Sequence, residues 1–97
     1  PDALMAAIDL LAMGCVNQLK SRGIVIPDEI SVMGYDNISL GELTQPPLTT
    51  IGQPIRKMGQ IAARMLIDQI RTGEQEKTKK IFEGELVIRQ TTRPVMK

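Results

Sequence analysis

The sequence has 97 residues, a length that allows at most one domain. Its 12 Lys and Arg residues against 11 Asp and Glu residues give a formal net charge of +1, which argues against an autonomous nucleic-acid-binding domain. The composition, 42% hydrophobic and 24% charged, is typical of a soluble globular segment, and no apolar run approaches the roughly 18 residues that a membrane span requires.

Missing and scarce residue types exclude several kinds of site. The sequence contains no histidine, so a Ser-His-Asp triad or a His-ligated metal would need residues from elsewhere. Its single cysteine, Cys15, excludes an internal disulfide and fits a reducing compartment. Because the sequence begins at Pro1, without Met or a signal peptide, we expect a segment truncated at its start. We expect no catalytic site, no metal and no cofactor.

The first third of the chain predicts a strand, a helix and a second strand. The apolar run at residues 3–8 predicts a short buried strand. Asp9 follows it and is placed to cap a helix that ends near Ser21, with Gly23 as its stop. A second apolar run, at residues 30–35, predicts a second buried strand. This spacing is typical of a βαβ unit with parallel strands.

The remaining chain predicts a loop, a short strand, a helix and a closing strand. Residues 36–48 are polar and end in two prolines, which predicts a loop. An extended piece at residues 49–51 precedes a helix that starts at Pro54 and ends at Gly73, and residues 81–89 predict the last strand. The fold class is therefore α/β, with a partial open parallel sheet flanked by helices. Because this is half an architecture, we expect it to fold only with more of its parent chain or with a second copy.

Asp36 is the strongest candidate for a binding residue. It directly follows the second predicted strand, at the edge where open α/β sheets bind ligands. A carboxylate there can accept hydrogen bonds from vicinal hydroxyl groups, and Gly34 permits close backbone approach. The alternative is that Asp36 and Asn37 form an Asx-type turn. Asp9 also follows a strand end, but helix capping accounts for it.

The first predicted helix has two faces. A rotation of 100° per residue gives an apolar face made of Leu11, Ala12, Cys15, Val16 and Leu19. Leu10 and Met13 point away from it, beside Asn17 and Lys20. Such residues are either ordinary surface residues or part of a subunit contact.

An ordered set of motifs resembles the C-terminal part of the LacI/GalR family of bacterial transcription regulators. The motifs are Pro1-Asp2-Ala3, Asp9-Leu10-Leu11-Ala12-Met13-Gly14, Gly23, Pro27-Asp28, Ile30-Ser31-Val32-Met33-Gly34-Tyr35-Asp36-Asn37, Pro46-Pro47-Leu48-Thr49-Thr50-Ile51, Gln53-Pro54, Met58-Gly59 and Glu85-Leu86-Val87-Ile88-Arg89-Gln90-Thr91-Thr92. The resemblance covers nearly the whole chain. It implies the C-terminal portion of a periplasmic-binding-protein-like (type I) two-lobed fold that holds a small-molecule effector in its cleft. Residues 1–52 and 84–97 would form the C-terminal lobe, residues 53–83 would cross into the N-terminal lobe, and the DNA-binding headpiece would precede Pro1.

The resemblance also implies roles for individual residues. Asp36 falls on the carboxylate that contacts a sugar or nucleoside effector in many members, which favours the binding role over the turn. Ile55 and Met58 fall on the cleft edge. Ile8 falls where the family often has Asn, Ser or Thr, and isoleucine cannot make that polar sugar contact. The positions on the family's dimer surface are Met13, Val16, Asn17, Leu43 and Thr44.

Three classes of function were compared on this basis. The resemblance implies the effector-binding and dimerising segment of a cytoplasmic transcription regulator, which binds operator DNA through the absent headpiece and has no membrane partner. The alternative is a periplasmic sugar-binding receptor for transport or chemotaxis, although the motifs at residues 46–51 and 86–92 resemble regulators instead. The third class, an enzyme, lacks a histidine, a phosphate-binding loop and paired carboxylates.

Overall fold

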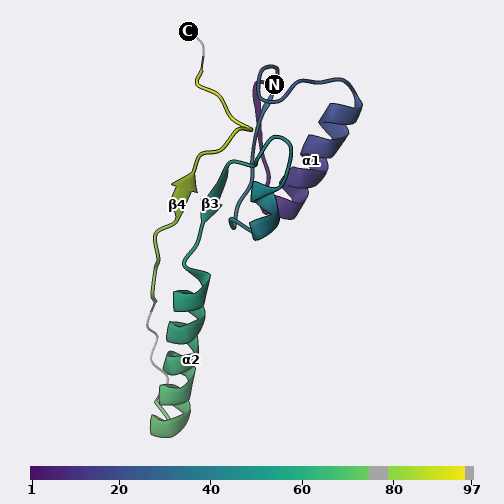
Figure 1. Ribbon diagram of the computed structural model, residues 1–97. Helices are drawn as coiled ribbons and strands as arrows, with labels where there is room; N and C mark the ends of the chain where they lie inside the picture. The colour runs from purple at the N-terminus through teal and green to yellow at the C-terminus, as the bar shows by residue number, and fades with distance from the viewer. Residues whose placement is uncertain (75–78, 96–97) are drawn as a thin grey trace. The chain divides into compact units, whose positions relative to one another are not determined.

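The structure of the chain, a computed structural model, describes residues 1–74 and 79–95 (Figure 1). The chain divides into two compact units, which we describe separately. Unit 1 consists of Pro1–Gly52 and Glu85–Lys97, and unit 2 of Gln53–Gly84. The assignment of residues 1–52 and 84–97 to one lobe and of residues 53–83 to a crossover into another stays a prediction, and residues 75–78 and 96–97 lie outside the described part.

Unit 1 contains two pairs of short strands. Strand β1 (Ala3–Met5) pairs in parallel with β2 (Ser31–Met33). Strand β3 (Thr50–Gly52) pairs in the antiparallel direction with β4 (Glu85–Val87). The predicted parallel strands and α/β class are confirmed, whereas each strand is shorter than its apolar run in the sequence.

Backbone hydrogen bonds join the two strand pairs at the end of β2. The amide of Gly34 donates to the carbonyl of Thr49 over 2.9 Å, and the amide of Asp36 donates to the carbonyl of Ile51 over 2.8 Å. The residues that follow β2 therefore run beside β3 in the parallel direction. The loop after β2 is thus fixed along one side by backbone pairing.

The helix α1 (Asp9–Ser21) packs on β2, and its buried positions differ from the predicted face. Ala12 is fully buried and Val16 is 3% exposed, whereas Leu11 is 57% exposed. Met13, which was predicted to point away, packs against the core instead. The inner face keeps Ala12, Val16 and Leu19 of the predicted one, with Asp9 and Met13 in place of Leu11, because the apolar pattern does not count the buried Asp9. The core of unit 1 consists of Ala6, Ala12, Val16, Ile26, Val32 and Leu48.

A buried threonine ties the end of the chain to the sheet. The hydroxyl of Thr91 donates to the carbonyl of Val32 over 2.7 Å and accepts from the amide of Thr49 over 2.8 Å. The carbonyl of Thr91 in turn accepts from the amide of Val32 over 2.8 Å. Segments that lie 59 residues apart in sequence are therefore joined through fully satisfied buried polar groups.

The predicted loop between β2 and β3 contains one turn of 3-10 helix, η1 (Ser39–Glu42). The amide of Leu48 donates to the carbonyl of Gly41 over 2.9 Å, which folds the following residues back onto η1. The Leu48 side chain is fully buried and belongs to the core. Gly41 and Leu48 therefore anchor the connection in unit 1, whereas Leu40 and Leu43 are exposed.

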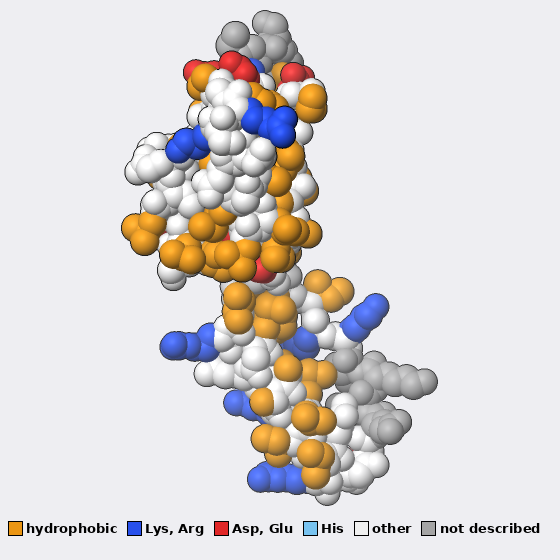
Figure 2. All heavy atoms as spheres, turned by 90° about the vertical axis from the view of Figure 1, so that its right-hand side faces the viewer, with side chains coloured by type: hydrophobic (Ala, Val, Ile, Leu, Met, Phe, Trp, Pro, Cys, Tyr) orange, Lys and Arg blue, Asp and Glu red, His pale blue; other side chains and the backbone are white. Residues whose placement is uncertain are grey.

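Unit 2 contains the helix α2 (Ile55–Thr72), with Pro54 before it and Gly73 after it, as predicted. Gly73 has a φ of 70°, a left-handed conformation that only glycine adopts without cost, and its amide closes the last turn on the carbonyl of Gln69. None of the α2 residues is buried. The apolar stripe of α2 consists of Ile55, Met58, Ile61, Ala62, Met65, Leu66 and Ile70. In Figure 2, hydrophobic side chains run along α2 between basic ones. Met58, Ile61 and Met65 are half-buried, and Ile55, Leu66 and Ile70 are exposed.

The exposed apolar side chains bear on whether the chain folds alone. We predict that the isolated 97-residue chain as a monomer lacks a sharp two-state unfolding transition, because an α2 stripe without buried side chains contributes little burial energy. Urea titration followed by circular dichroism, with the mass in solution measured by light scattering, checks this. A cooperative transition of a monomeric species would contradict it.

A second stability prediction concerns Gly34. A Cβ at this position would overlap the Asp9 carboxylate and lie 3.1 Å from both Asp9 Cα and Leu48 Cδ2. Gly34→Ala should therefore lower the free energy of unfolding of the protein that carries this segment by about 1–3 kcal/mol, the usual cost of overpacking. Gly14→Ala is the matched control, because a Cβ there meets nothing within 4 Å and the exposed helix site gains about 1 kcal/mol from alanine. Equal thermal midpoints for the two variants would contradict the packing argument.

Candidate functional site

The candidate site is the turn that follows β2, where Asp36 lies at the carboxyl end of a parallel strand as predicted. Two consecutive residues here have positive φ angles, 116° at Asp36 and 57° at Asn37. Non-glycine residues in this region cost about 1–3 kcal/mol each and persist only where surrounding contacts hold them. The turn is therefore a strained segment whose conformation is imposed by its neighbours.

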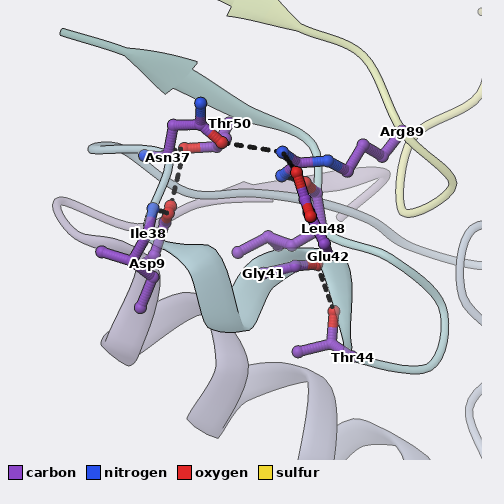
Figure 3. A network of polar contacts seen from close by, with 9 residues as sticks. All are labelled: Asp9, Asn37, Ile38, Gly41, Glu42, Thr44, Leu48, Thr50 and Arg89. Carbon is purple, nitrogen blue, oxygen red and sulfur yellow. Dashed lines mark hydrogen bonds and ion pairs between the residues drawn. The ribbon is translucent and has the colours of Figure 1, made fainter. Parts of the chain in front are cut away.

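Asp9 supplies one of these neighbouring contacts, and the prediction that it caps α1 is wrong. Its side chain makes no capping hydrogen bond and is 0% exposed. Instead, Oδ2 accepts from the amide of Ile38 over 2.8 Å, and Oδ1 accepts from the hydroxyl of Thr50 over 2.7 Å. The amide of Asp9 also donates to the carbonyl of Tyr35 over 2.9 Å. The start of α1 is thus bonded to both ends of the turn and to β3. Figure 3 shows the bonds of Asp9 to Ile38 and Thr50.

Thr50 lies between Asp9 and the turn. Its side chain is fully buried. Its hydroxyl oxygen accepts a hydrogen bond from the amide of Asn37 over 3.2 Å, and the same hydroxyl donates a hydrogen bond to Asp9 Oδ1. The hydroxyl is therefore used as donor and acceptor at once. This hydroxyl links the Asp9 carboxylate to the amide of Asn37, in addition to the direct hydrogen bond from the amide of Ile38.

Arg89 holds the side chain of Asn37 from the opposite side (Figure 3). Its Nη2 donates to Asn37 Oδ1 over 2.7 Å, and its Nη1 donates to the carbonyl of Leu48 over 2.9 Å. Nη2 also lies 3.6 Å from Glu42 Oε1, but the Glu42 side chain is exposed, so that ion pair contributes little. The closing segment of the chain therefore contributes directly to the turn.

Sequence reasoning missed these supporting residues. Arg89 belongs to the closing-strand motif and Thr50 to the extended piece at residues 49–51, and neither pattern indicates a supporting role. One signal was present: Asp9, Ala12 and Val16 have the i, i+3, i+7 spacing of a single helix face, which places the carboxylate on the buried side. No sequence pattern indicates its partners, because they lie 29 and 41 residues away.

The other predicted binding residues fall into both units. Ile8 is 40% exposed and immediately precedes Asp9, so it lies at the same edge of the sheet as the turn. Ile55 is exposed and Met58 is half-buried, both in the first turn of α2 in unit 2. The structure therefore brings Ile8 to the Asp36 turn, and the grouping of Ile55 and Met58 with them stays a prediction.

The predicted dimer residues differ in how much surface they offer. Leu43 is 77% exposed and Asn17 is exposed. Thr44 is half-buried, and its hydroxyl donates within its own loop, with the carbonyls of Gly41 and Pro46 at 3.0 and 2.9 Å. Correcting the prediction, Val16 is a core residue with almost no surface for a partner, since α1 turns it toward β2, and Met13 is partly covered.

The chemistry available at the turn is that of a hydrogen-bond acceptor. Within residues 1–74 and 79–95, no three Cys, Asp or Glu side chains gather in a way that could hold a metal ion. A cavity of about 510 Å³ lies against β1, β2 and residues 92–95, but neither Asp36 nor Ile8 lines it. The position of Asp36 after β2 is what supports it as a ligand contact, and that contact stays a prediction. No helix in the described part is both long and apolar enough to cross a membrane.

Comparisons with known proteins identify the family. Residues 1–92 match the family described as the periplasmic binding protein-like domain. The HTH-type transcriptional repressor PurR of Vibrio parahaemolyticus is 43% identical over 93 residues, which cover 96% of this chain and 28% of that protein. The chain thus spans less than a third of the length of this curated relative.

Solved structures agree in fold. A LacI family transcriptional regulator from Enterococcus faecium with bound ribose has a TM-score of 0.86 and 38% identity, over 98% of this chain and 35% of that one. The lac repressor dimer bound to operator and the anti-inducer ONPF has a TM-score of 0.84 and 35% identity, over 95% and 32% of the two chains. The resemblance noted in the sequence is confirmed. The chain belongs to the periplasmic binding protein-like domain family, in the form that LacI/GalR-type regulators carry.

Proposed function

We propose that this chain is the effector-binding and dimerising segment of a cytoplasmic LacI-type transcription regulator. The relative named above is a transcriptional repressor, and one similar structure is a repressor dimer on its operator. Operator binding itself belongs to a headpiece outside this sequence, in keeping with the net charge of +1. The observation that carries the proposal is the Asp36 carboxylate at the carboxyl end of β2, the edge where open α/β sheets bind ligands.

The proposed effector is a sugar or a nucleoside-like molecule with vicinal hydroxyl groups. An ionised carboxylate accepts only, so Asp36 matches hydroxyl donors. One similar structure holds ribose, which has such hydroxyls. Ile8 at the same edge offers an apolar side chain instead of a polar contact, which suits the carbon face of a ring. Ile55 and Met58 are proposed to contact the effector from the second lobe.

The proposed mechanism is a shift between two lobe orientations. Residues 1–52 and 84–97 would belong to one lobe, and residues 53–83 would cross into the other. An effector that binds one orientation more tightly raises its population, and the headpieces then fit the operator better or worse. A periplasmic receptor would share the fold, but the repressor relatives favour the regulator and give no support to an enzyme.

The first test is the substitution Asp36→Ala in the natural protein that contains this segment. The affinity for the tightest-binding of D-ribose, adenosine and cytidine should fall by about 10–100-fold, because hydrogen bonds to a charged acceptor are lost. Isothermal titration calorimetry measures it. The unsubstituted protein should also bind the 2-deoxy form of the same compound more weakly.

Asp28→Ala is the matched control, because it removes an exposed carboxylate from the connector before β2. Its affinity should equal that of the unsubstituted protein. Equal affinities for Asp36→Ala and Asp28→Ala would remove Asp36 from the binding site. Failure of all three probes to bind the unsubstituted protein at millimolar concentration would contradict the proposed effector class.

The dimer proposal has its own test at Leu43. Leu43→Asp places a charge on a side chain that is largely exposed in this chain, so it should leave the fold intact and weaken a dimer contact. We expect the mass measured by size-exclusion chromatography with light scattering to fall toward that of one chain. Val25→Asp, at an exposed apolar residue outside the predicted surface, should leave the mass unchanged. A dimer that survives Leu43→Asp would place the interface elsewhere.

A further inference from the structure

We propose that Asp9 is a positioning residue for the effector site, acting through Thr50 to hold the strained turn that carries Asp36. This inference rests on the proposed function, because it takes Asp36 as the effector contact. Asp9 itself does not touch the effector, since its side chain is 0% exposed. It would determine where the Asp36 carboxylate lies.

The first step in the argument is that three successive backbone amides of the turn donate hydrogen bonds to neighbouring segments. The amide of Asp36 donates to the Ile51 carbonyl, the amide of Asn37 to the Thr50 hydroxyl, and the amide of Ile38 to Asp9 Oδ2. Three successive backbone amides are therefore used to hold a segment with φ angles of 116° and 57°. Such a conformation is maintained only when its surroundings determine it.

The second step is that the Asp9 carboxylate is suited to this task. A buried charge is tolerated only with its hydrogen bonds made, and Asp9 accepts one bond on each oxygen. It also lies in the first turn of α1, where the helix dipole favours a negative charge. The absence of a Cβ at Gly34 leaves space for it. The acceptor for the turn is therefore fixed to the rigid start of a helix.

The third step is that two of these bonds share one hydroxyl. Thr50 is fully buried, donates to Asp9 Oδ1 over 2.7 Å and accepts from the amide of Asn37 over 3.2 Å. Loss of this single hydroxyl removes one of the two partners of Asp9 and the partner of the Asn37 amide together. Figure 3 shows Thr50 between Asp9 and Asn37.

The test uses two neighbouring threonines. Thr50→Val removes the shared hydroxyl at nearly constant volume. Thr49→Val is the matched control, because Thr49 is also buried, but its hydroxyl bonds to Thr92 and to the backbone amide of Arg89. The Arg89 guanidinium, which holds Asn37, is bonded separately to the Leu48 carbonyl. Both variants lose a buried hydroxyl, and only one of these hydroxyls bonds to the turn and to Asp9.

Two readouts are expected to separate the variants in the natural protein. Hydrogen exchange of the amides of residues 36–38 should become at least about tenfold faster in Thr50→Val and stay within about twofold in Thr49→Val. The affinity for the tightest-binding of D-ribose, adenosine and cytidine should fall by about 5–30-fold in Thr50→Val only. Unchanged exchange in Thr50→Val would overturn the hold on the turn, and faster exchange with unchanged affinity would overturn the positioning role.

A double-mutant cycle separates positioning from general destabilisation. If Thr50 acts through Asp36, Thr50→Val should have almost no further effect on affinity in the Asp36→Ala background, whereas independent effects would multiply. Multiplying effects would overturn the inference. Asp9→Asn, which keeps an acceptor for the Ile38 amide, should retain more affinity than Asp9→Ala, and equal losses in the two would also count against it.

Failure of the proposed function would look different. If none of the three probes binds the unsubstituted protein, the effector proposal fails and the positioning role fails with it. The hydrogen-exchange comparison of Thr50→Val with Thr49→Val needs no ligand. It would then still decide whether Asp9 and Thr50 hold the turn.

Discussion

The hydrogen bonds of the buried Asp9 carboxylate join three segments of unit 1 that are well separated in sequence. They link the start of α1 to Ile38, after β2, and to Thr50 in β3. A charge removed from water requires such partners, and the partners are held in place in return. Gly34 leaves space for this carboxylate, and two of the three amide hydrogen bonds of the strained turn lead to it, one directly and one through Thr50.

In the proposed site, the residue that contacts the ligand is different from the residues that hold the turn in place. Asp36 lies at the edge of the sheet, whereas the groups that determine its position are in the interior. Arg89 adds support from the closing segment of the chain, through Asn37. A strained turn held in this way is already ordered before a ligand binds. Less conformational entropy is therefore lost on binding.

Unit 2 differs from unit 1 in how few of its apolar side chains are buried. Its helix α2 keeps a full apolar stripe without a single buried residue. The amphipathic pattern is what a helix shows when it packs against a partner, so the stripe supports the proposal that residues 53–83 belong to a second lobe. Unit 1, in contrast, builds a core of its own between α1 and the sheet.

Local sequence determined the kind and order of the elements: apolar runs placed β1 and β2, and Pro54 and Gly73 set the ends of α2. It also placed Asp36 after a strand, and an ordered set of motifs identified the family. Only the tertiary structure decided that Asp9 accepts from Ile38 and Thr50 rather than capping α1, that Met13 packs against the core, and that Thr50 and Arg89 support the turn. Periodicity shows which face of an element is apolar. It does not identify the hydrogen-bond donors of a buried carboxylate, because these donors lie 29 and 41 residues away and only the fold brings them to it.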